Sequence, residues 1–131
     1  IFRESNRFRK DVKMFVEKSE ILKTEMADGV VRRMLGYGDK IMACEMIFPK
    51  GAYVEPHCHN SHQQMVYVLR GKFELQCGEE KRIMLPGNLC YCGYNEIHAT
   101  RSLEDGSAIL DVHTPLRQDI IDDSHAAQKT Q

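Results

Sequence analysis

Residues 51–71 read GAYVEPHCHNSHQQMVYVLRG, and this stretch decides what the fold can be. His57 and His59 lie two positions apart, so on an extended strand both side chains point to one face and Cys58 points to the other. Neutral imidazole is a common ligand of zinc, copper, iron and nickel. Gln64 opens the apolar run Met65–Leu69, which is typical of a buried strand, and its amide oxygen is a further uncharged ligand. The stretch therefore predicts a metal site at the mouth of a strand.

A second stretch, residues 86–98, reads PGNLCYCGYNEIH and supplies a third imidazole. His98 follows the turn-like segment Gly93-Tyr94-Asn95 and begins another extended segment. The fold has to bring His98 close to the first stretch. If it does, three imidazoles and one amide suit a single divalent ion.

Turn signals recur every eight to twelve residues or so along the rest of the chain. They separate short extended segments, and in the segment Ile41–Phe48 the apolar side chains alternate onto one face. This spacing is typical of an all-β sandwich or barrel. The turn signals are Asp28-Gly29, Gly36–Asp39, Pro49–Gly51, Gly71-Lys72, Gly78–Glu80, Pro86–Asn88 and Glu104–Gly106.

Length and charge narrow the class of protein. A chain of 131 residues forms one domain with a real core, and a net charge of −1 gives no basic field for nucleic acid. No apolar run approaches the roughly 18 residues of a membrane helix, and no secretory signal is evident.

Five dispersed cysteines, an odd number, favour reduced thiols and a cytoplasmic location over a disulfide framework. Cys90 and Cys92 alternate on one strand, but no two further zinc ligands are evident, so both are interpreted as wall residues.

The two ends of the chain differ in composition from its middle. Residues 1–20 are rich in Arg, Lys and Glu with scattered phenylalanines, which indicates a short helix or an arm. Residues 120–131 are polar and are expected to form a frayed tail after a short helical turn. The expected organisation is an arm at 1–20, a domain at 21–119 and a tail at 120–131.

A further informative segment, residues 109–119, reads ILDVHTPLRQD. Asp111 and His113 are two positions apart at the end of a predicted strand and share a face. If that face is the barrel interior, a carboxyl group and an imidazole lie beside the metal. Pro115 ends the strand, and Arg117 on the following turn can reach over the mouth of the barrel. An arginine there suits a carboxylate substrate, because the planar guanidinium binds carboxylates through two hydrogen bonds.

These motifs resemble those of the cupin superfamily. In the first cupin motif, a count of six residues back from the closing glycine places the third ligand at Gln64, where the family usually has glutamate. The resemblance implies a double-stranded β-helix, or jelly-roll barrel, with one divalent metal ion inside, and it implies a homodimer. The matching positions are Gly51, His57, His59 and Gly71 in the first motif, and Gly87 and His98 in the second.

The chain further resembles a narrower group of cupins, from pectin and alginate degradation, which convert 4,5-unsaturated uronates into linear keto forms. In that group two histidines, a glutamine and a third histidine bind the metal, which implies His57, His59, Gln64 and His98 here. The metal itself, whether zinc, nickel, manganese or iron, does not follow from the sequence.

The same group has an Asp-x-Phe-x-Pro-x-Arg segment that supplies a catalytic aspartate and a substrate-binding arginine. Asp111, Pro115 and Arg117 match it, whereas His113 stands at the phenylalanine position. The resemblance therefore implies a metal-dependent enzyme acting on a small carboxylated, sugar-like molecule. In it Asp111 moves the proton, Arg117 holds the carboxylate, and His113 replaces an apolar wall by a polar ring.

Other interpretations stay open. An iron-dependent oxygenase, or a biosynthetic isomerase or decarboxylase, would use the same ligands, and a barrel of this kind can also bind a ligand without catalysis. At the level of single residues, Gln63 is the alternative ligand to Gln64, Asp111 can be structural, and Arg117 can form a surface ion pair. His113 is a candidate catalytic residue, and it can instead support a neighbouring group or simply pack against the wall. His62, in the loop between the ligands, is expected to be exposed at the rim.

Overall fold

Short antiparallel strands dominate residues 12–129, the part of the chain that the computed structural model describes. Their boundaries follow the turn signals of the sequence. The strands are β1 (Leu22–Glu25), β2 (Val31–Tyr37), β3 (Met42–Phe48), β4 (Tyr53–His57), β5 (Gln63–Arg70), β6 (Phe73–Cys77), β7 (Glu80–Met84), β8 (Leu89–Cys92), β9 (His98–Ser102) and β10 (Ser107–Thr114). Two 3₁₀ turns, η1 (Lys18–Glu20) and η2 (Ala27–Gly29), flank β1, and a helix, α2 (Gln118–Lys129), follows the last strand.

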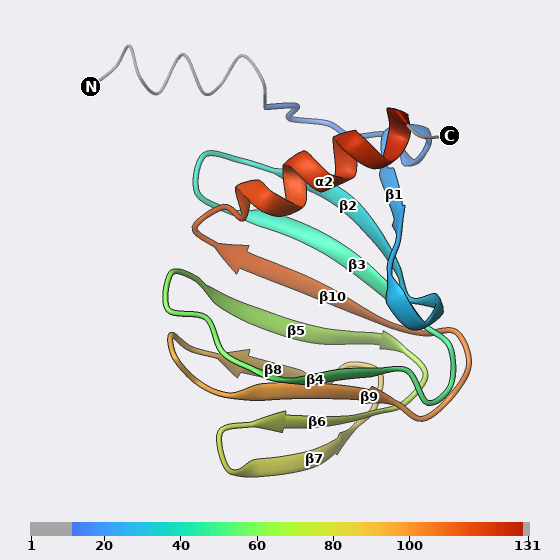
Figure 1. The fold of residues 1–131 in the computed structure, drawn as a ribbon, viewed down its shortest axis with the longest axis vertical. Coiled ribbons are helices and arrows are strands. Elements are labelled where there is room, and N and C mark those ends of the chain that lie inside the picture. Colours follow the sequence, from blue (N-terminus) through green and yellow to red (C-terminus); the bar gives the residue numbers. More distant parts are fainter. Residues whose placement is uncertain (1–11, 130–131) are drawn as a thin grey trace.

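The strands form two sheets that face each other (Figure 1). The larger sheet has the order β1-β2-β3-β10-β5-β8, and the smaller has the order β4-β9-β6-β7. Strand β10 is therefore inserted between β3 and β5, which precede it by many residues. This antiparallel arrangement with distant partners is a jelly roll, and it confirms the predicted all-β class.

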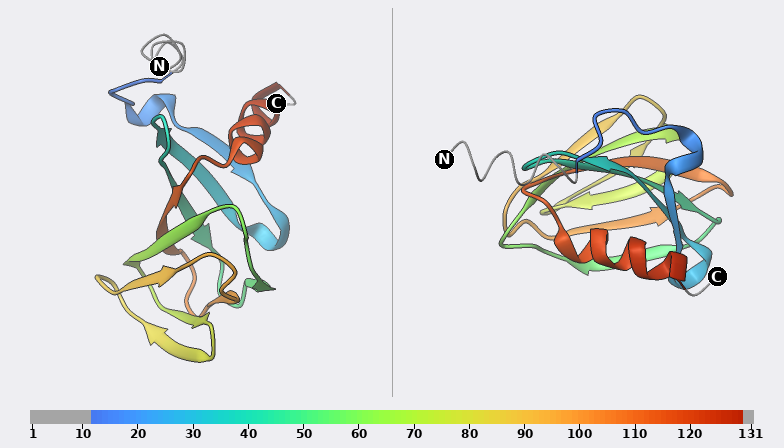
Figure 2. Two further views of the ribbon diagram at one scale, coloured as in Figure 1. Left: turned by 90° about the vertical axis from the view of Figure 1, so that its left-hand side faces the viewer. Right: turned by 90° about the horizontal axis from the view of Figure 1, so that it is seen from above.

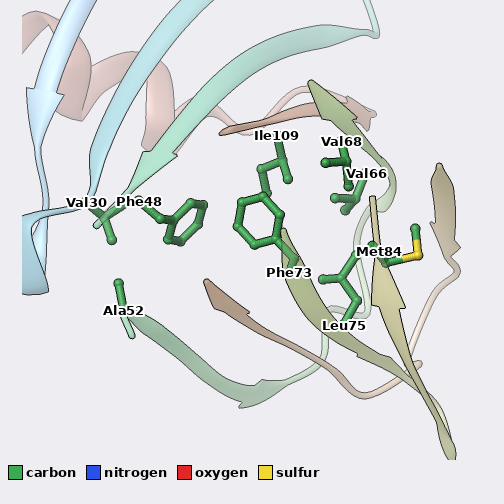
Figure 3. Close-up of a cluster of buried hydrophobic side chains, with 9 residues drawn as sticks. All are labelled: Val30, Phe48, Ala52, Val66, Val68, Phe73, Leu75, Met84 and Ile109. Atoms are coloured by element: carbon green, nitrogen blue, oxygen red, sulfur yellow. The ribbon is translucent and has the colours of Figure 1, made fainter. Parts of the chain in front are cut away.

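An apolar core fills the space between the two sheets (Figure 3). Phe48 from the larger sheet and Phe73 from the smaller sheet meet edge to face at its centre, with ring centroids 5.3 Å apart. As predicted, alternate residues of β3 share one face, and Met42, Cys44 and Phe48 on that face are buried inside the barrel. The buried members of the core are Val30, Phe48, Ala52, Val66, Val68, Phe73, Leu75, Met84 and Ile109.

Gly71, which closes the first motif, lies in a tight turn against the start of β10. It has a φ of +78°, and an added Cβ atom would lie 2.6 Å from Cα of Ser107. The buried Ser107 hydroxyl accepts a hydrogen bond of 3.0 Å from the Lys72 amide next to this glycine. Only glycine fits both this backbone conformation and this close approach.

The C-terminal residues differ from the frayed tail expected from their polar composition. Residues 118–129 form helix α2, which packs against β1 and β2 and lies beside β1 in all views (Figures 1 and 2). Ile120 and Ile121 join Met34, Met42 and Cys44 in a second apolar cluster. These two isoleucines attach the first turn of the helix to the larger sheet. At the other end, residues 12–20 contain only the turn η1, and the remainder of the predicted arm lies outside the described residues.

Strand β5 is buried on one face only, which corrects the prediction of a fully buried strand. Val66 and Val68 point into the core, whereas Met65, Tyr67 and Leu69 are 37–46% exposed on the outer face. The apolar run thus contributes side chains both to the core and to the outer surface of the larger sheet. No helix within residues 12–129 is long and apolar enough to cross a bilayer.

Candidate metal centre and cavity

Two rows of side chains, one from each sheet, meet inside one end of the barrel. In the smaller sheet, His57 at the end of β4 pairs with His98 at the start of β9. In the larger sheet, Gln64 at the start of β5 pairs with His113 near the end of β10. Directly paired residues of antiparallel strands present their side chains to the same face. The register therefore brings together stretches that are far apart in the sequence.

Three imidazoles form the centre of this site. Ligand atoms of His57, His59 and His98 all lie within 4.8 Å of one another. His57 Nδ1 is 2.7 Å from the Glu55 carbonyl oxygen, and His98 Nδ1 is 3.0 Å from that of Glu96. If each Nδ1 donates its proton to that oxygen, the Nε2 lone pair is free, which is how proteins commonly orient metal-binding histidines.

The burial and charge of the histidines fit a metal ion. His98 Nε2 is fully enclosed and has no hydrogen-bond partner in the protein, a costly arrangement that a metal ion would relieve. Burial lowers the pKa of His59 to about 4 and also lowers the pKa of His98. These two rings are therefore neutral at physiological pH, which is the form that binds metal.

Gln64, rather than Gln63, faces the imidazoles. Gln64 lines the same cavity as His57 and His98. Gln63 points the other way: its amide donates to the Thr114 hydroxyl at 3.3 Å, and its carbonyl oxygen accepts from the Tyr91 hydroxyl at 2.6 Å. The alternation of β5 thus distinguishes the two glutamines.

Asp111, His113 and Arg117 line the same cavity, which has a volume of about 230 Å³. Oδ1 of Asp111 and Nδ1 of His113 are enclosed without a hydrogen-bond partner in the protein. Burial raises the pKa of Asp111 to about 7, against an opposing effect of the positive Arg117. Burial also lowers the pKa of His113 to about 3, so this imidazole stays neutral. The cavity therefore offers one carboxyl group that changes its protonation near neutrality.

Arg117 is held at the mouth by an ion pair with Asp119. Its Nε and Nη2 donate to the two carboxylate oxygens at 3.1 and 2.6 Å. The hydrogen bonds from Arg117 lower the pKa of Asp119. Arg117 thus both lines the cavity and forms a surface ion pair, the two alternatives that the sequence left open.

His62 was expected at the exposed rim, and this expectation is wrong. The residue is 6% exposed, and its ring lies 4.0 Å from that of His59 and 5.4 Å from that of His113. Burial lowers its pKa to about 4. His62 lies in a loop, where no strand alternation indicates the direction of a side chain, so the sequence carries no signal for its burial.

Arg32 is a cavity residue that the sequence analysis missed. It is 6% exposed, and its Nε and Nη2 are enclosed without a hydrogen-bond partner in the protein. The sequence does contain a signal for this burial, since Arg32 alternates with the inward-facing Val30, just before β2, and with Met34 on β2. A buried cation without a partner is costly and favours an anionic ligand.

Comparisons with known proteins agree with this geometry. Residues 44–113 match the Cupin domain family model. The chain is 38% identical, over 97 residues, to a pectin degradation protein, KdgF, of Dickeya dadantii (strain 3937), and the match covers 74% of this chain and 88% of that protein.

Solved structures give the same result. The structure of KdgF from Halomonas sp. superposes with a TM-score of 0.77 at 30% identity, covering 81% of this chain and 98% of that one. A RmlC-like cupin from Shewanella frigidimarina superposes with a TM-score of 0.76 at 25% identity, covering 82% and 96% of the two chains.

Proposed function

Because this chain belongs to the cupin family, we propose that it is a metal-dependent enzyme that isomerises a small carboxylated, sugar-like molecule. The observation that carries the proposal is the convergence, in one cavity, of three imidazoles, an enclosed carboxyl group and two arginines. The similarity to proteins named for pectin degradation supports an unsaturated uronate as the substrate and its linear keto form as the product.

In this proposal the metal site consists of His57, His59, His98 and Gln64, which hold one divalent ion of zinc, nickel, manganese or iron. A bound ion would supply Lewis-acid chemistry by polarising the oxygens of the sugar. Imidazole nitrogens and an amide oxygen are uncharged donors, so a bound ion would keep its full positive charge towards the substrate.

Asp111 is the proposed proton carrier. Ring opening breaks the bond between the anomeric carbon and the ring oxygen, the anomeric hydroxyl loses a proton, and a former alkene carbon gains one. The product is an isomer, so one group that accepts and returns a proton is sufficient. A carboxyl group with a pKa of about 7 is suited to both steps near neutral pH. His113 is proposed to form a hydrogen bond with a substrate hydroxyl through its enclosed Nδ1.

Arg117 and Arg32 are the proposed partners of the substrate carboxylate. Arg117 lies at the mouth with its guanidinium oriented by Asp119. Arg32 lies deeper, without a partner of its own, so an entering carboxylate would satisfy a buried donor. Two cations in a small cavity favour a small anionic substrate over a neutral sugar.

We also propose a homodimer that functions in the cytoplasm. The outer face of β5 and β8 is apolar, and the register pairs Met65 with Tyr91 and Tyr67 with Leu89 across it. These four side chains are 39–53% exposed, so a second copy would remove a continuous apolar surface from water. All five cysteines are free thiols, which suits a reducing compartment.

The experiment that tests the proposal follows the ultraviolet absorbance of a 4,5-unsaturated uronate, whose conjugation is lost on conversion to the keto form. We expect the metal-loaded protein to accelerate this loss. Asp111→Asn should reduce kcat by roughly 100- to 10,000-fold, the contribution expected of a general acid–base group. A variant as active as the wild type would contradict the role of Asp111.

Two outcomes would reject the enzyme proposal as a whole. Oxygen consumption by the iron-loaded protein, without uronate conversion, would indicate an oxygenase. Binding of the uronate with recovery of the unchanged molecule after long incubation would indicate a ligand-binding protein.

A further inference from the structure

Three of the five cysteines gather in a second cluster that the mechanism above does not use. Sγ atoms of Cys77, Cys90 and Cys92 all lie within 4.8 Å of one another, and those of Cys90 and Cys92 are 3.8 Å apart. Cys77 ends β6 in the smaller sheet, whereas the other two alternate along β8 in the larger sheet. The cluster therefore joins the two sheets.

The cluster has its own cavity next to the histidine site. Cys77 and Cys90 line a hollow of about 440 Å³ together with Glu96. Cys92 lines the histidine cavity and is paired with Gln64, so it lies between the two spaces. Strand pairing places the cysteine cluster and the histidine site at the same level of the barrel. The ligand atoms of the cysteines and of the histidines nevertheless form two separate groups.

The spacing of the sulfur atoms suits a tetrahedral thiolate site. Zinc–sulfur bonds of about 2.3 Å at tetrahedral angles separate two sulfurs by about 3.8 Å. Cys90 and Cys92 already have this separation. The third sulfur, of Cys77, lies 3.3 Å from the Tyr91 carbonyl oxygen, on the strand segment between the other two cysteines.

Glu96 lies beside Cys77, at the edge of the group formed by the three sulfur atoms. Its Oε2 lies 3.9 Å from Cys77 Sγ, and its Oε1 accepts a hydrogen bond of 3.1 Å from the Gly93 amide. An added Cβ at Gly93 would lie 2.8 Å from this Oε1, so the glycine leaves room for the carboxylate. Carboxylate oxygen is an accepted zinc ligand beside cysteine.

The remaining cysteines lack these features. Cys44 is buried among apolar side chains, and burial raises its pKa to about 12, while Cys58 is exposed. Neither of these two thiols belongs to the group of three whose ligand atoms lie within 4.8 Å of one another.

We propose that Cys77, Cys90 and Cys92, with Glu96 as the fourth ligand, bind one thiophilic d¹⁰ cation, zinc in the first instance, separately from the histidine site. Such an ion would link β6 to β8 and fix the wall that carries Gln64 and His98.

The test is a titration of the metal-stripped, reduced full chain with Zn²⁺, with Cd²⁺ as the spectroscopic probe of thiolate coordination. We expect two equivalents of Zn²⁺ and a thiolate-to-cadmium charge-transfer band in the ultraviolet. A triple variant, Cys77→Ser with Cys90→Ser and Cys92→Ser, should bind one equivalent and lose the band. The double variant His57→Ala with His59→Ala should also bind one equivalent but keep the band.

Cys58→Ser is the matched control, because it removes a thiol outside the cluster, and it should leave both stoichiometry and band unchanged. Glu96→Gln keeps the thiols and should weaken Zn²⁺ binding at the cluster by at least about tenfold, since even ligand-supporting groups contribute that much. Circular dichroism verifies that each variant folds. The proposal is overturned if the wild type shows no band, or if the band survives in the folded triple variant.

Discussion

Arg32 and Asp111 are charged residue types that line the cavity. Each has side-chain atoms enclosed in the cavity without a hydrogen-bond partner in the protein. Such groups reduce stability, because a buried polar atom loses its hydration and gains nothing in return. Both are therefore suited to interact with a ligand, and each can be tested by a single substitution.

Replacing Asp111 by Asn should change how stability depends on pH. The folded-state pKa of Asp111 is about 7, above its ordinary value of 3.8, so folding favours the protonated form. Stability from this group is complete below pH 3.8 and is lost as pH rises through about 7. The full loss corresponds to about 4 kcal/mol at most, with about 2–3 kcal/mol of it between pH 5 and pH 8.

The measurement is urea unfolding of metal-free wild type and Asp111→Asn at pH 5 and pH 8. The free energy of unfolding of the wild type should fall, relative to that of the variant, between pH 5 and pH 8. Histidines with lowered pKa values cost stability in acid, but they are common to both proteins and cancel in the comparison. A difference between the proteins that is the same at both pH values would mean that Asp111 is not enclosed.

Replacing Arg32 by Met should weaken the substrate interaction without loss of stability. A charged hydrogen bond contributes about 1.5–3 kcal/mol, so kcat/KM for the uronate should fall roughly ten- to a hundredfold. Arg33→Met is the matched control, because Arg33 is paired with Glu45 at 2.9 Å and does not line the cavity. Equal losses of kcat/KM in the two variants would argue against a specific role for Arg32.

Single residues also show where sequence analysis succeeds and where it stops. His57 lies at the end of β4, as strand alternation predicted, whereas His59 lies just beyond that strand. The assignment of Gln64 and His98 depended on the resemblance to the two cupin motifs. Arg32 alternates with buried apolar residues, but a charged side chain is seldom fully buried, so its type argues against the interior that its position indicates. The burial of His62 depends on a loop path that no periodic pattern describes.

Among the elements, helix α2 is the one that composition misrepresents. Its polar residues suggested a tail, yet Ile120 and Ile121 pack in one apolar cluster with Met34 of β2 and with Met42 and Cys44 of β3. The decisive information is tertiary, since Leu22, Met34, Met42 and Cys44 of β1 to β3 provide the apolar surface that the helix covers. Strand boundaries, in contrast, are local, and the turn signals predicted them.

Ile121→Ala should destabilise the protein by about 2–4 kcal/mol, because a large apolar side chain is removed from a packed cluster. Asp123→Ala, an exposed change on the same helix, should stay within about 0.5 kcal/mol of the wild type. Thermal and chemical unfolding measure both values. If Ile121→Ala were as stable as the control, the packing of α2 would not contribute to the fold.

At the scale of the whole molecule, the apolar outer face of β5 and β8 predicts that two copies of the chain associate. Tyr67→Arg together with Leu89→Lys places two cations on the proposed contact and should give a monomer where the wild type is expected to be a dimer. Ile83→Lys on β7 is the control, since Ile83 is 49% exposed, like the contact residues, but belongs to the other sheet. Light scattering after size-exclusion chromatography gives the mass. A dimer that survives the double substitution would place the contact elsewhere.

The insertion of β10 between β3 and β5 also bears on how the protein is made. During synthesis β3 and β5 emerge first, and each keeps an unpaired edge until β10 has left the ribosome and entered the gap. Open edges of this kind invite pairing with other chains, and contacts between distant segments form slowly. Strand β10 is also the one that brings Asp111 and His113. Completion of the sheet and completion of the cavity are therefore the same late event in the life of each chain.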